Sequence, residues 1–267
     1  MNVLRYELRA ARVSAILWIC TIVALVALFM SIYPAFANDA TAVLNVFKNM
    51  PAAMRNITGA DADMKLFSFL GFFANIFPFI TLIGAIEAAV LGFGILSKES
   101  IAKTTDFLLT KPKTRRAIYW QKTGASVIML LATQVVVVAA AILLSRWSNA
   151  GSYDMGQFMM LWGAFVLIQF FMFTLCVLLS QLVKKLRSPV PPALGLSFGL
   201  FLLALFALVI GENSVRWLTP FRFIDYKKII TDGTYDMGHI VYALVLIAAF
   251  TAVSYIIYTR KDVPAAV

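Results

Sequence analysis

Residues 96–122 read LSKESIAKTTDFLLTKPKTRRAIYWQK, and this stretch lies between two long apolar runs. It carries seven of the 23 Lys and Arg residues in a chain that is 61% hydrophobic and only 13% charged. Soluble domains have roughly 25% charged residues, and apolar runs of about 18 residues or more are typical of membrane-spanning helices. A basic connection between two such runs indicates a membrane protein that crosses the bilayer several times.

The apolar runs predict an all-α fold, a polytopic membrane protein with six transmembrane helices in one domain, residues 1–267. We expect the spans at residues 15–36, 66–96, 118–144, 157–182, 192–210 and 239–258. In the fifth span, Gly195 and Gly199 have the small-x-x-x-small spacing that lets helices approach closely. Chance is the alternative there, because glycine is common in membrane helices.

Residues 1–14 predict a short amphipathic helix on the membrane surface ahead of the first span. Arg5, Arg9 and Arg12 fall on one side of its helical wheel, and Glu7 falls beside the neighbouring apolar side. A basic flank that only sets orientation is an alternative. A cleaved signal peptide is disfavoured, because the apolar run that follows is longer than a signal core.

The distribution of basic residues predicts the orientation of the chain. Six spans put both termini on one side, and that side holds 15 of the 23 Lys and Arg residues, against 8 on the other. By the positive-inside rule, both termini and the connection (residues 96–122) are cytoplasmic, in a cell membrane. The net charge of +10 arises from these segments between spans, so we expect a lipid membrane and no nucleic acid as partner.

Glu87 lies inside the second span. A carboxylate in the bilayer costs at least about 2.5 kcal/mol on insertion scales, so this side chain should face protein or water. It is a candidate for a transport path, for a proton carrier, or for a packing contact with a hydroxyl or amide of another span, and the packing role is favoured. Asn75 and Gln169 are candidate members of the same path or packing site, with Gln134 and Gln181 as further polar partners.

Several kinds of chemistry have no support in the sequence. The P-loop pattern G-x-x-x-x-G-K-[ST] does not occur, and no glycine is followed directly by lysine. The single histidine, His239, lies at the edge of the last span and is expected at the interface, while Cys20 and Cys176 lie in apolar runs. We therefore expect no catalytic residues, no metal site and no cofactor in this chain.

The middle of the connection predicts a short helix. Thr104, Thr105 and Asp106 are suitable N-cap and first-turn residues, and Pro112 would end the helix. Thr114 can then cap the helix that becomes the third span.

Phe107, Leu108 and Leu109 form the apolar part of this short helix. They are too few to hold a helix in water, so they need a groove or a membrane surface beneath them. A short helix between two spans can act as a lever, because moving it moves both spans.

The connection resembles a segment of the permease subunits of type-2 ABC exporters. It fits the pattern E-x4-T-x-[DE]-x-L-L-[ST]-x-P-x-[ST]-R-x-x-[IV]-x3-K with Glu99, Thr104, Asp106, Leu108, Leu109, Thr110, Pro112, Thr114, Arg115, Ile118 and Lys122. The basic N-terminal segment, the six spans, Met50-Pro51 with a following glycine, and Leu218-Thr219-Pro220-Phe221 before the last span are also similar to that family.

The resemblance implies a cytoplasmic ABC ATPase in two copies, which binds ATP and Mg, and a second permease subunit that is alike or different. It implies that the helix at residues 104–110 enters a cleft of the ATPase. Leu108 and Leu109 would dock the helix, while Glu99 and Arg115 would brace it. Closure of the ATPase pair would then open an outward path for a substrate such as an antimicrobial peptide, a drug or a lipid.

Two other functions remain open from the sequence. One is an ATP-independent carrier or channel that uses Glu87 as its coupling group. The other is a membrane protein without transport activity, such as an assembly or immunity factor. A neighbouring reading frame that encodes a P-loop ATPase would separate the first function from these two.

Overall fold

The computed structural model describes residues 3–38, 49, 51, 68–98, 114–148, 151–183, 186–210 and 214–260. Six helices in this part are long and apolar enough to cross a membrane, and the described residues contain no strand. These helices are α1 (Val3–Asn38), α4 (Phe69–Ile95), α7 (Arg115–Trp147), α8 (Met155–Leu182), α9 (Val190–Ile210) and α11 (Met237–Arg260). The prediction of an all-α fold with six spans is confirmed.

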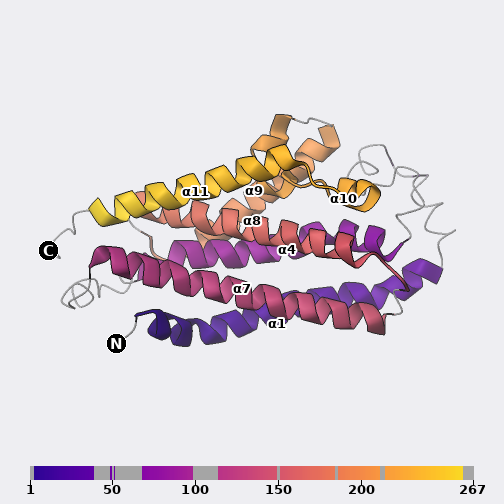
Figure 1. Cartoon of the computed structure of the whole chain (residues 1–267), viewed down its shortest axis with the longest axis horizontal. Coiled ribbons are helices and arrows are strands. Elements are labelled where there is room, and N and C mark those ends of the chain that lie inside the picture. Colours follow the sequence, from indigo (N-terminus) through magenta and orange to yellow (C-terminus); the bar gives the residue numbers. More distant parts are fainter. Residues whose placement is uncertain are drawn as a thin grey trace.

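The long helices lie side by side, and the start of α1 and the end of α11 lie at the same end of the bundle, which we call the terminal end (Figure 1). α4 and α8 form the most extensive helix pair and occupy the centre. α1 and α7 pack against each other along one side, while α11 packs on α8 and α9 packs on α4. α4 is therefore the helix that most of the others contact.

Small residues bring α4 and α8 close together. A Cβ atom at Gly84 would lie 2.2 Å from Cε2 of Phe165, and one at Gly92 would lie 2.6 Å from the carbonyl oxygen of Phe173. Ala88, between these glycines on the same face, is fully buried. In the described part of the chain, small residues at small-x-x-x-small spacing thus bring helices together on α4.

The glycine pair of α9 behaves differently from the expectation. A Cβ atom at Gly195 or Gly199 would have no atom of another described helix within 4 Å. α9 contacts the bundle through a different face, which carries its buried residues Ala193, Ser197 and Phe201. Among the described residues, Gly195 and Gly199 do not mediate helix packing.

The N-terminal segment forms no separate helix. α1 runs without interruption from Val3 to Asn38, so the helix does not end near residue 14 as expected, while a place for residues 1–14 on the membrane surface stays a prediction. A helix of 36 residues is about 54 Å long, whereas the hydrocarbon core is about 30 Å thick. The apolar run simply continues the turn-by-turn hydrogen bonding of the basic segment, because no proline or glycine separates them.

The other helix starts agree with their capping residues. Thr114 caps α7, with its hydroxyl oxygen accepting a bond from the Ala117 amide at 3.3 Å, so this prediction is confirmed. Pro191 and Pro192 occupy the first turn of α9, where the absence of amide hydrogens removes no intrahelical bond.

At the end opposite the termini, a short segment joins α9 to α11 through η2 (Ser214–Trp217), η3 (Pro220–Arg222) and α10 (Tyr226–Asp232). The Thr219 hydroxyl donates to the Leu200 carbonyl at 2.8 Å, and the Tyr235 hydroxyl donates to the Met160 carbonyl at 2.7 Å. These two bonds fasten the segment to α9 and α8.

His239 lies in the first turn of α11, at the edge of the span as expected. Its side chain is buried rather than exposed, and its ring stacks on Trp217 with a centroid distance of 4.1 Å. Asp236 lies beside it, with Oδ2 at 3.0 Å from Nδ1.

Candidate functional site at the base of the connection

Most residues of the predicted coupling segment lie outside the described residues: Glu99, Thr104, Thr105, Asp106, Phe107, Leu108, Leu109 and Pro112. The structure does describe both ends of this segment. Lys98 lies just beyond the C-terminus of α4, and Arg115 lies, partly buried, in the first turn of α7.

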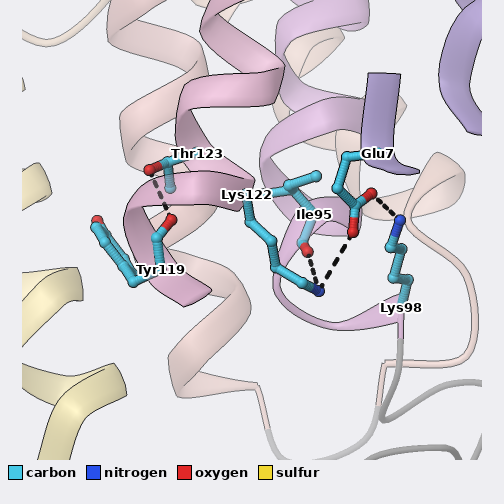
Figure 2. Close-up of polar contacts among 6 residues, drawn as sticks. All are labelled: Glu7, Ile95, Lys98, Tyr119, Lys122 and Thr123. Carbon is cyan, nitrogen blue, oxygen red and sulfur yellow. Dashed lines mark hydrogen bonds and ion pairs between the residues drawn. The ribbon is translucent and has the colours of Figure 1, made fainter. Parts of the chain in front are cut away.

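Three charged side chains meet at the base of the connection, and we call them the basal ion cluster: Glu7, Lys98 and Lys122 (Figure 2). The Glu7 carboxylate, on α1, is 2% exposed. Its Oε2 accepts from Nζ of Lys98, and its Oε1 lies 3.8 Å from Nζ of Lys122 on α7. One carboxylate thus joins three segments that are distant in sequence.

Lys122 also closes the C-terminus of α4. Its Nζ donates to the carbonyl oxygen of Ile95, the last residue of α4, at 3.0 Å (Figure 2). The last carbonyl groups of a helix have no partner within the helix, and a positive charge there is favoured by the helix dipole. A side chain from the first turns of α7 therefore fixes where α4 ends.

The burial of this cluster makes its pairing important. Lys122 is 1% exposed, whereas the Lys98 side chain is 36% exposed. Removing one partner of a buried ion pair leaves an uncompensated charge, which costs about 3–5 kcal/mol. If the two ends of the connection separated from α1, the buried Glu7 carboxylate would be exposed or would lose its ion-pair partners. The cluster therefore links α1, α4 and α7 at this point.

The sequence signal for this cluster is indirect. Glu7 interrupts an amphipathic segment, and Lys122 is the last residue of the pattern in the connection. A lone acidic residue among three arginines beside an apolar face was the available signal. Its partners lie 91 and 115 positions later in the chain, so only the packing of the helices could identify them.

A second group of polar side chains lies at the middle of the bundle, and we call it the central polar network. Glu87 is 1% exposed; its Oε1 accepts from the Thr133 hydroxyl at 2.8 Å and its Oε2 from Nε2 of Gln169 at 3.2 Å. Gln169 also donates to the Gly84 carbonyl at 3.2 Å, and Gln134 donates to Oε1 of Gln169 at 2.5 Å. The network joins α4, α7 and α8.

The structure brings together only some of the polar residues proposed from the sequence. Gln169 contacts Glu87 directly, and Gln134 joins through Gln169. Asn75 does not reach this network, because its amide donates to the Gly71 carbonyl of its own helix at 3.1 Å. The sequence does not identify Thr133 as a member of the network, since a threonine in an apolar run gives no sign of which helix it faces.

The family model for ABC-2 family transporter proteins matches residues 1–263. The chain belongs to the ABC-2 transporter family. The resemblance found in the connection is thereby confirmed over nearly the whole length, and the six apolar helices are those of a multi-pass membrane permease. Permeases of the ABC-2 family generally work with ATPase subunits in a lipid membrane. The search of curated proteins found no match to this ABC-2 family chain.

Proposed function

We propose that this ABC-2 family chain is the permease subunit of an ATP-driven exporter, forming the substrate path and coupling to a separate cytoplasmic ATPase. Family membership supports this role. The chain has no P-loop in which backbone amides could cradle phosphates, so ATP and Mg²⁺ belong to the partner subunit. Two permeases, identical or different, would work with two ATPase subunits.

The basal ion cluster is the observation that carries the coupling proposal. A short helix on the connection can transmit movement only if its two ends are firmly attached to the spans. Lys98 and Lys122 flank the predicted lever, and both pair with Glu7. A push on the lever would therefore move α1, α4 and α7 together, and not merely bend the connection.

The direction of coupling follows from the charge distribution. The terminal end carries the larger share of basic residues, which favours its position in the cytoplasm. In that orientation the lever at residues 104–110 faces the ATPase. Closure of the ATPase pair would press on it, and the path would open on the other side of the membrane.

The face of α9 that carries Gly195 and Gly199 supports pairing with a second permease. Neither glycine has a neighbour within 4 Å of its potential Cβ atom, and the large side chains Phe198 and Leu202 on α9 are exposed. Small residues on a membrane helix allow another helix to approach closely. This face is thus available to a second subunit.

The docking step can be tested by replacing both Leu108 and Leu109 with Asp. We expect loss of co-purification of the co-expressed ATPase and loss of transport, because two carboxylates would be forced into an apolar groove. Lys111→Asp is the matched control: it adds a carboxylate to the same connection outside the docking pair, and it should keep the ATPase bound. Full retention of the ATPase and of transport in the double Asp variant would refute the docking assignment.

The central polar network supports a packing role for Glu87 over a role in the path. Both carboxylate oxygens have donors from other helices, and the side chain is enclosed. Glu87→Gln should therefore leave transport largely intact in the assembled exporter. Loss of transport with normal assembly and normal ATP hydrolysis would instead favour a path residue or an ATP-independent carrier.

For the substrate, the apolar spans favour an amphipathic or hydrophobic compound such as an antimicrobial peptide, a drug or a lipid.

A further inference from the structure

A groove of about 220 Å³ lies between α7, α8 and α11, toward the terminal end of the bundle. This groove is separate from the basal ion cluster and from the central polar network. For comparison, a cavity of about 150 Å³ with apolar walls stays dry and binds benzene. The lining of the groove includes Tyr119, Thr123, Val127, Phe173, Thr174 and Thr251.

Every hydroxyl group that lines the groove already has a partner inside the protein. Thr174 and Thr251 donate to carbonyl oxygens of their own helices, at 3.0 and 2.7 Å, and Thr123 donates to the Tyr119 carbonyl at 2.8 Å. The Tyr119 hydroxyl is bonded to the Ser254 hydroxyl at 2.6 Å. No hydroxyl is left to recognise a polar ligand, so the groove suits a hydrocarbon.

The position of the groove matches one leaflet of a bilayer. Its lining on α7 extends from Tyr119 to Val127, which is about 12 Å along the helix, while half the hydrocarbon core is about 15 Å thick. At its terminal end the rings of Trp120 and Tyr255 lie 5.7 Å apart, and Trp120 is 55% exposed. Exposed tryptophan and tyrosine are typical of the membrane–water interface.

A positive charge lies on the same side of α7 as the groove. Arg116 is exposed and precedes Trp120, Thr123 and Val127 by four, seven and eleven residues, which places all four on one helical face. Arg116 therefore lies about one turn beyond the aromatic pair, where lipid headgroups would be. A guanidinium group is well suited to bind a phosphate through two parallel hydrogen bonds.

We propose that this groove binds one acyl chain of an anionic phospholipid from the leaflet at the terminal end, with the lipid phosphate on Arg116. The apolar lining favours an acyl chain as ligand, and the length and position of the groove match the leaflet at the terminal end. The guanidinium group of Arg116 favours a negatively charged headgroup. The proposal does not depend on ATP-driven export, because it concerns a lipid site on the outside of the helix bundle.

Native mass spectrometry of the purified full-length chain, incubated with phosphatidylglycerol or with phosphatidylcholine of the same acyl chains, tests the site. We expect one tightly retained phosphatidylglycerol on the wild type. Thr174→Phe should fill the groove and weaken this binding about tenfold, and it removes no bond between helices because Thr174 donates only within α8. Thr21→Phe is the matched control, since Thr21 is exposed on α1 and also donates only within its own helix.

Two further variants separate the parts of the proposal. Thr251→Leu fills the groove from α11 and should also weaken phosphatidylglycerol binding. It therefore tests the groove if Thr174→Phe does not fold. Arg116→Gln should abolish the preference for phosphatidylglycerol over phosphatidylcholine while a lipid chain still binds. Unchanged lipid retention in the folded groove-filling variants would overturn the groove, and an unchanged preference in Arg116→Gln would overturn the headgroup assignment.

Discussion

Two buried carboxylates, Glu7 and Glu87, hold α4 in different ways. Glu7 meets two ammonium groups at the terminal end of the bundle, whereas Glu87 meets a hydroxyl and an amide at its middle. The difference follows from depth in the membrane. A lysine at the bilayer centre costs about 2.5–3.5 kcal/mol on insertion scales, whereas hydroxyl and amide donors carry no charge.

We expect the C-terminal end of α4 and the middle of α4 to have different tasks. The basal ion cluster ties both ends of the connection to α1, so movement of the connection is passed on to the helices that carry these charges. The central polar network is enclosed by three helices, and Glu87 is only 1% exposed, so its bonds are shielded from bulk solvent. We therefore expect α4 to be held rigidly at its middle and to move, in the proposed coupling, at its C-terminal end.

The largest effect is expected from Glu7→Ala, which would remove the buried carboxylate that Lys98 and Lys122 share. We expect the free energy of unfolding in detergent to fall by about 3 kcal/mol, because removing one partner of a buried ion pair is strongly destabilising. Arg9→Ala, on the exposed side of the same helix, is the control and should change little. In a double-mutant cycle, adding Lys122→Met should recover part of the loss; strict additivity of the two effects would show that the pair does not interact.

The second-largest effect is expected from a variant that disturbs the close packing of α4 against α8, and it tests whether this packing or the polar bonding holds the middle of α4. Gly92→Ala should destabilise the protein by about 1–3 kcal/mol, because the new Cβ atom would lie 2.6 Å from a backbone oxygen of α8. Gly195→Ala has no neighbour within 4 Å and should be tolerated in the isolated subunit. Thermal unfolding of the two variants measures this difference in stability. Equal stability of the two variants would contradict the close packing of α4 against α8.

A smaller effect is expected within the central polar network. Thr133→Val removes the hydroxyl that donates to Glu87 and should cost about 0.6 kcal/mol, the average for such bonds between membrane helices, and at most about 1.7 kcal/mol. Thr21→Val is the control, because its hydroxyl bonds only within α1. A loss as large as that of Glu7→Ala would mean that the two carboxylates are held equally firmly, contrary to the comparison.

The smallest effect is expected from Lys98→Met. This ammonium is more than a third exposed, so its pair with Glu7 is screened by solvent and is worth about 0.5 kcal/mol. The loss should shrink further in high salt, because exposed charges are screened by ions. If the loss were instead independent of salt, Lys98 would have to be as enclosed as Lys122.

The sequence determined the elements and the membrane environment. The apolar runs placed the six spans, with the caps at Thr114 and the prolines of α9 marking where helices begin, because hydropathy and capping act on neighbouring residues. The pattern in the connection identified the family. The error at residue 14 arose because composition changes there while the helix geometry does not, and no residue interrupts the backbone bonds.

The tertiary structure decided which buried groups meet. Nothing local to Glu7 predicts Lys98 and Lys122, and nothing local to Glu87 distinguishes Gln169, which reaches it, from Asn75, which bonds its own helix. The same holds for the glycines: Gly84 and Gly92 are packed against α8, whereas a Cβ atom at Gly195 or Gly199 would meet no other helix within 4 Å in the described part of the chain. The side a residue faces depends on how whole helices pack against one another, and that packing sums contacts between segments far apart in sequence.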